Sequence, residues 1–162
     1  PTSRDNTAID AGLQALVVMA LEAGAELCDV LGEKEAAAAS RASATLARGH
    51  RRAPSPSKQA NALAVLAGMA DAKTVNQQIL SKNPYSALST FYGYYVLEAR
   101  ARAGDHQGAL DLIRAYWGGM LDRGATTFWE GFELEWLDGS GRIDELTPTG
   151  TRDLHSDYGD YC

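Results

Sequence analysis

Apolar residues recur every three or four positions along most of the chain before residue 124, which is the spacing of one face of an α-helix. In the segment 5–31 this spacing joins Ile9, Leu13, Leu16, Val17, Ala20, Ala23 and Leu27. Asp5, Asn6 or Thr7 can cap the exposed amides at its start, and Gly32 can end it. The pattern predicts one long amphipathic helix over 5–31.

Further helical patterns follow, and Pro54, Pro56, Asn83-Pro84 and Gly104 interrupt them. Asp105 can cap the helix that follows Gly104. Short connections force antiparallel neighbours, so we expect hairpins of 5–31 with 33–48, of 57–70 with 74–81, and of 86–103 with 105–122. Period-two alternation of useful length is absent before residue 125, so the predicted fold class is all-α. Helical hairpins in series curve into solenoids or toroids. The sequence has no fixed-period repeat, which argues against a standard short-repeat solenoid.

The helical pattern stops after Gly124. Residues 126–129 favour extended structure, and 138–141 form a turn signal. Residues 133–137 can therefore pair with 142–146 as a short β-hairpin. The rest of the chain reads as an irregular, acidic loop.

Composition narrows the classes of partner. With 162 residues, the chain suits one domain, and its net charge of −6 argues against nucleic-acid binding, which needs clustered Lys and Arg. The longest apolar-rich stretch, Leu13–Ala25, is broken by Gln14, Glu22 and Gly24, so no membrane span is expected. Cys28 falls on the apolar stripe and is interpreted as a buried thiol. Because Cys162 is the final residue, the two cysteines form no evident disulfide framework, and the compartment stays open.

Glu130 is the leading candidate for chemistry. Beside Phe128, Trp129 and Phe132 its carboxylate would be partly desolvated, which raises a pKa and suits proton transfer. Flat aromatic rings also stack on the C–H faces of sugars. The simpler interpretation remains open, in which the two rings beside it are core residues and Glu130 is merely solvated.

Other candidates carry weaker signals. Glu133 and Glu135 are possible second carboxylates, although an extended segment puts them on the face opposite Glu130. Tyr85, at a helix start, is a candidate to contact a ligand. The group Tyr92, Tyr94 and Tyr95 is interpreted as hairpin core.

No cofactor or metal is predicted. His155 with Asp153, Asp157 and Asp160 matches no known ligand spacing, and an acidic solvated loop explains it. No Gly-rich phosphate loop, nucleophile elbow or paired-Cys zinc motif occurs.

The residues Tyr116–Leu121, followed by Gly124–Glu130, resemble the catalytic domain of bacterial α-L-rhamnosidases, glycoside hydrolase family 78. The resemblance extends back through 99–113 and 59–66, and forward into 154–162. It covers most of the chain, and the run Ala-Thr-Thr-Phe-Trp-Glu that ends at Glu130 is its most specific part.

The resemblance implies an (α/α)6 barrel, of which residues 1–162 would form about the second half. It implies that Glu130 is the general base of an inverting mechanism. Trp129, Tyr85 and Phe128 are the candidate substrate-binding residues, on the grounds of their aromatic side chains and their positions. The general acid lies in an earlier motif of the family that has no match here, and a later Cys-His-Trp motif is also absent. The chain alone is therefore expected to be inactive.

The implied partner is a rhamnose-containing glycoside, and the apolar faces that half a barrel exposes favour self-association. A non-catalytic helical module that binds sugar or protein is the main alternative. A hydrolase on the same barrel with another substrate is a third, because fold alone does not set chemistry.

Overall fold

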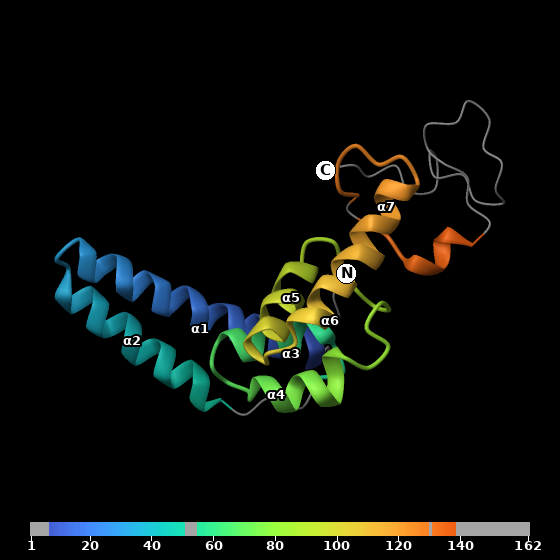
Figure 1. The fold of residues 1–162 in the computed structure, drawn as a ribbon. Helices are drawn as coiled ribbons and strands as arrows, with labels where there is room; N and C mark the ends of the chain where they lie inside the picture. Colours follow the sequence, from blue (N-terminus) through green and yellow to red (C-terminus); the bar gives the residue numbers. More distant parts are fainter. Residues whose placement is uncertain (1–6, 51–54, 130, 139–162) are drawn as a thin grey trace.

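A computed structural model of the chain describes residues 7–50, 55–129 and 131–138 (Figure 1). All regular elements in these ranges are helical and none is a strand, which confirms the all-α class. The elements are α1 (Thr7–Val30), α2 (Lys34–Gly49), α3 (Lys58–Leu66), α4 (Ala72–Val75), the π-helix η1 (Asn76–Leu80), α5 (Gly93–Arg102), α6 (His106–Leu112), the π-helix η2 (Ile113–Trp117), α7 (Gly118–Asp122) and the 3₁₀-helix η3 (Leu134–Leu137).

The first two helices form an antiparallel hairpin that projects from the remaining helices (Figure 1). Gly32, whose φ is +81°, makes the turn between them, a left-handed conformation that favours glycine. At the other end of the hairpin the Gln14 amide donates to the carbonyl oxygens of Ala47 at 2.5 Å and His50 at 2.7 Å. These contacts confirm the predicted pairing of the first two helices.

The face that α1 buries is not the predicted apolar stripe. Ala15, Val18 and Ala25 are fully buried, whereas Val17 and Leu27 of the stripe are about half exposed. Small side chains let α2 and α3 approach α1 closely, and the bonds from Gln14 set its rotation toward α2. The larger aliphatic side chains therefore point outward. Cys28 is only partly buried, so the expectation of a buried thiol was wrong.

By length and composition, α1 is also apolar enough to cross a membrane, over Ile9–Val30 with a hydropathy of 1.4. The sequence expectation that no such stretch exists was too strict. Core helices of soluble proteins and signal sequences pass the same test, so the finding assigns no membrane role.

The main core lies among α3, α5 and the continuous helical run α6–η2–α7. Its largest fully buried side chains include Leu80, Val96, Leu112, Tyr116, Met120 and Trp129. The helix α3 contacts α4 and η1, and α5 contacts α6, as the two later predicted hairpins require.

The helix predicted to begin at residue 86 begins at Gly93 instead. The Lys58 ammonium donates to the carbonyl oxygens of Asn83 and Ser86, and Gln59 donates to that of Ala87 at 2.8 Å. Asn83 and Ala87 have positive φ angles of 44° and 53°. Because α3 uses these carbonyls and the backbone there is left-handed, the segment cannot join a right-handed helix.

The segment 133–137 was predicted as a strand, and the structure corrects this. Leu134–Leu137 is a 3₁₀-helix, and its predicted partner 142–146 lies outside the described residues. Leu134 and Leu137 both pack on the main core near Gly119, and Arg123 donates to the Leu137 carbonyl at 2.7 Å. Residues three apart share a face in a 3₁₀-helix but point to opposite faces of a strand, so burying both leucines selects the helix.

Candidate functional site

The neighbours of Glu130 lie in opposite environments, and Glu130 itself lies outside the described residues. Trp129 is 1% exposed and packs in the main core, whereas Phe128 is 55% exposed. Alternation of this kind is expected where a chain runs extended across a surface. Tyr85, partly exposed, does not line the cavity that Phe128 borders. The roles assigned to Glu130, Trp129, Phe128 and Tyr85 stay predictions.

The segment after Gly124 is anchored to the helical run beneath it. The Tyr116 hydroxyl donates to the Phe132 carbonyl at 2.7 Å, and the Phe132 ring lies edge-on to those of Tyr116 and Trp129, with centroids 5.3 and 5.6 Å apart. Burial raises the pKa of Tyr116, a hydrogen bond with the Thr90 side chain opposes that rise, and the nearby Glu133 carboxylate adds to it. The hydroxyl therefore stays protonated and keeps donating near neutral pH.

A cavity of about 730 Å³ opens beside this segment. Its size is within the range of small-molecule sites, and aromatic rings dominate its wall. It is lined by Ser89, Thr90, Phe91, Tyr92, Tyr94, Leu97, Ile113, Trp117 and Phe128. Phe128 thus links the run that ends at Glu130 to a hollow with four further aromatic side chains.

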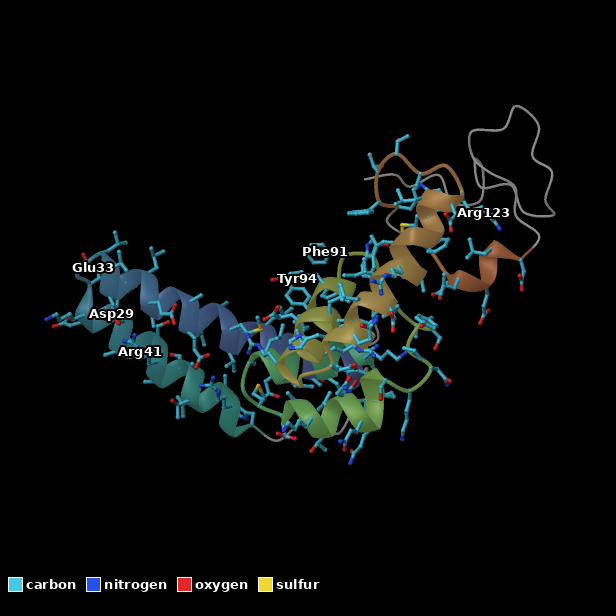
Figure 2. All side chains as sticks on the ribbon, in the orientation of Figure 1. Asp29, Glu33, Arg41, Phe91, Tyr94 and Arg123 are labelled. Carbon is cyan, nitrogen blue, oxygen red and sulfur yellow. The ribbon has the colours of Figure 1, made fainter. Side chains whose placement is uncertain are left out.

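Two elements, α5 and η2, position most of these side chains. Phe91 precedes α5, and Tyr94 and Leu97 follow it at helical spacing, so the three share one side of the helix start. Figure 2 shows Phe91 and Tyr94 close together on that side. Ile113 and Trp117 come from the ends of the π-helix η2, a type of turn that occurs often at functional sites.

Trp117 depends on a glycine for its position. A Cβ atom placed on Gly93 would lie 2.7 Å from the Trp117 ring, which is closer than non-bonded atoms approach. Glycine at the first residue of α5 therefore lets the indole pack directly on the helix backbone. The same ring contacts Tyr116 edge-on, with centroids 5.0 Å apart.

The polar groups at the cavity are hydroxyls. The Ser89 hydroxyl accepts a hydrogen bond from the Tyr92 amide at 3.4 Å. The Thr90 hydroxyl oxygen is buried near the Tyr116 hydroxyl, and its interaction with that group lowers the pKa of Tyr116. An apolar wall with a few hydroxyls is suited to a ligand that has both apolar faces and hydroxyl groups, as a sugar does.

Glu133 is the described carboxylate with features of a proton-transfer group. Burial raises its pKa, the Glu135 carboxylate raises it further, and the Lys58 ammonium opposes the change. Burial lowers the pKa of Lys58 itself. Such a shift is common at active sites but also accompanies packing, and Glu133 does not line the cavity.

No group of three or more His, Cys, Asp or Glu side chains could hold a metal ion within the part of the chain that the structure describes. The acidic residues around His155 lie outside the described ranges, so the interpretation of that segment as a solvated loop stays a prediction.

Tyr92 and Tyr94 were interpreted as hairpin core, and the structure corrects this. Both line the cavity, and of the three tyrosines only Tyr95 packs against the buried clusters. The spacing held a usable signal, because Phe91, Tyr94 and Leu97 form a face distinct from that of Val96 and Ala99. A helix with two separate apolar faces can serve both a core and a ligand surface.

Comparisons of the chain with protein-family models, curated proteins and solved structures find no match. The case for a function therefore rests on the residues of the site.

Proposed function

We propose that this chain forms part of an inverting glycoside hydrolase resembling α-L-rhamnosidase, which removes terminal α-L-rhamnosyl groups in a longer parent protein. The observation that supports it most is the aromatic cavity bordered by Phe128. That residue belongs to the same short run as Glu130. Glycoside cleavage uses two carboxyl groups, and a carboxylate beside stacking surfaces for a sugar would supply one of them.

In this proposal the antiparallel helical pairs belong to one half of an (α/α)6 barrel. Glu130 acts as general base and takes a proton from the water that attacks the anomeric carbon. The general acid comes from outside this chain, with about 6.5–9.5 Å between the two carboxyl groups, as inversion requires. Phe91, Tyr94 and Phe128 offer ring faces to the sugar.

Binding by the 162-residue chain tests the cavity directly. We expect methyl α-L-rhamnoside to change the fluorescence of Trp117 and the NMR signals of the cavity residues. Phe91→Ala should weaken binding about fivefold, because one stacking surface contributes about 1 kcal/mol. Leu121→Ala is the matched control, since Leu121 is also exposed but does not line the cavity. Equal affinities for both variants would contradict the cavity as the sugar site.

Catalysis is tested separately. The chain alone should not hydrolyse an aryl α-L-rhamnoside, and turnover by a pure preparation would contradict the need for an acid from elsewhere. In a complete parent enzyme, Glu130→Gln should lower kcat by several orders of magnitude with folding unchanged, as expected for a general base that also orients the water. Near-normal turnover would exclude Glu130 from that role.

A non-catalytic module that binds sugar or protein is the second candidate. It is favoured by the cavity lining, whose described residues are aromatic, aliphatic or hydroxyl-bearing and include no carboxylate. A parent protein that binds the sugar but does not hydrolyse an aryl α-L-rhamnoside, with or without Glu130→Gln, would select this candidate.

A further inference from the structure

An exposed apolar stripe follows the outer side of α1. It consists of the exposed residues Leu13, Val17, Ala20, Leu27 and Leu31, the last lying just beyond the end of α1, and of Gly24, which is partly buried because its open side faces Ser40 of α2. Their spacings alternate between four and three residues, as in the seam between two helices packed along their lengths. The four large side chains of this outer stripe are exposed, in a helix whose buried side already contacts α2 and α3.

The outer stripe is uncharged along its whole length, although the chain has a net charge of −6. The acidic residues of α1 between its ends lie toward α2 instead. Glu22 pairs with Arg48 at 2.5 Å and Asp29 pairs with Arg41, while Glu26 also raises the pKa of Arg41. Two such stripes can therefore approach without bringing like charges together.

The order of side-chain sizes in the outer stripe reads the same in both directions. Counted from position 22, Leu13 mirrors Leu31, Val17 mirrors Leu27, and Ala20 mirrors Gly24. An antiparallel copy with its twofold axis beside position 22 would place large aliphatic residues opposite one another at both ends. Ala20 would meet Gly24 at the centre, where neither position carries a large side chain. We propose that the outer stripe is the contact face of a twofold dimer with a second copy of this chain.

The available area suits a dimer of modest stability. A helix of 24 residues is about 36 Å long and about 10 Å wide, so the outer side of α1 covers about 360 Å². Standard interfaces bury about 800 Å² per partner. The outer side of α1 thus supplies about half of a standard interface, so we expect the dimer to be weak.

A lipid surface is the competing occupant, since α1 is apolar enough to cross a membrane. The polar bonds of α1 to α2 disfavour it. A spanning α1 would carry Gln14, Glu22 and Asp29, with their partners on α2, into hydrocarbon, where buried polar and charged groups are costly. A second copy covers the outer stripe and leaves these bonds in water.

Sedimentation velocity on the 162-residue chain tests the dimer. We expect a monomer–dimer equilibrium that Val17→Glu weakens at least about 100-fold, because the new carboxylate would face Leu27 of the second copy without a partner. Leu110→Glu is the matched control: Leu110 is 47% exposed, Val17 49%, and Leu110 lies on α6, away from the hairpin. A monomer at all concentrations, or equal effects of the two variants, would overturn the proposal.

Cross-linking tests the antiparallel register. In a Cys28→Ser, Cys162→Ser background, a mixture of Leu13→Cys and Leu31→Cys chains should form a disulfide-linked pair under mild oxidation. Each variant alone should not, since each residue faces the other position in the second copy. Efficient linkage of either variant with itself would overturn the register. Binding of a monomeric chain to phosphatidylcholine vesicles would overturn the dimer in favour of a lipid surface.

Discussion

The α1–α2 hairpin and the packed helices from α3 to α7 use the same apolar periodicity in opposite ways. Among α3–α7 several large residues, such as Leu112 and Met120, are fully buried. In the hairpin the fully buried residues of α1 are mostly small, and the large ones face outward. A stripe at helical spacing therefore shows that a helix forms, while its neighbours decide which of its faces they cover.

The largest expected difference concerns deleted aliphatic side chains. Leu112→Ala should lower the free energy of unfolding by about 3 kcal/mol, because it removes a fully buried side chain and leaves a cavity. Leu27→Ala in the hairpin should change it by less than about 0.5 kcal/mol. Urea unfolding monitored by circular dichroism, at concentrations where the chain is monomeric, measures both. Similar losses would show that the hairpin face is covered in the monomer.

Ion pairs also differ between the hairpin and the packed helices. Asp105→Asn should cost about 2–3 kcal/mol, since it leaves the buried Arg100 guanidinium, bonded to Asp105 at 2.7 Å, without its counter-charge. Asparagine still caps α6, so the loss reports the charge. Asp29→Asn removes the exposed pair with Arg41 and should cost less than about 0.5 kcal/mol. If both variants lost the same free energy of unfolding in urea, the Arg100–Asp105 pair would not be more buried than the Arg41–Asp29 pair, contrary to the structure.

Acid unfolding gives an independent measure of the Arg100–Asp105 pair. Burial alone would raise the pKa of Asp105, but the hydrogen bonds from Asn76 and Arg100 outweigh it and hold that pKa below its ordinary value near 3.8. A depressed carboxyl pKa stabilises the fold above the unfolded-state pKa and is lost as pH falls through the folded-state value. Stability should therefore fall below about pH 4, and Asp105→Asn should flatten that decline. If the stability of the variant declined with falling pH as steeply as that of the original chain, Asp105 would not be the source of the decline.

The smallest substitutions add one methyl group at a glycine in each of the two regions. Gly93→Ala should cost about 1–2 kcal/mol and alter tryptophan fluorescence, because the new methyl group would meet the Trp117 ring. Gly49→Ala, at the end of α2, meets nothing within 4 Å and should stabilise the chain by about 0.5 kcal/mol. Thermal unfolding of both variants measures the effects. A stabilising Gly93→Ala would show that the indole moves freely.

The candidate site was only partly accessible from the sequence. Phe128 was identified from its neighbours, and it does border a cavity. Phe91, Ile113 and Trp117 were not identified, because their importance comes from the start of α5 and from η2 lining one cavity. Distances of this kind depend on packing between segments far apart in the chain, which local patterns do not encode.

Local chemistry was enough to place the helices and several of their ends. Gly32 and Gly104 end helices with positive φ, and Asp105 caps α6 by accepting from the Gly108 amide at 3.0 Å, as predicted. These features depend on neighbours a few residues away, which the sequence shows directly. Only the tertiary structure decided that α5 begins at Gly93 and that the outer stripe of α1 faces solvent. Both depend on bonds across more than twenty positions, from Lys58 to Asn83 and from Gln14 to Ala47. Such bonds form only when distant segments meet, so no local periodicity could predict them.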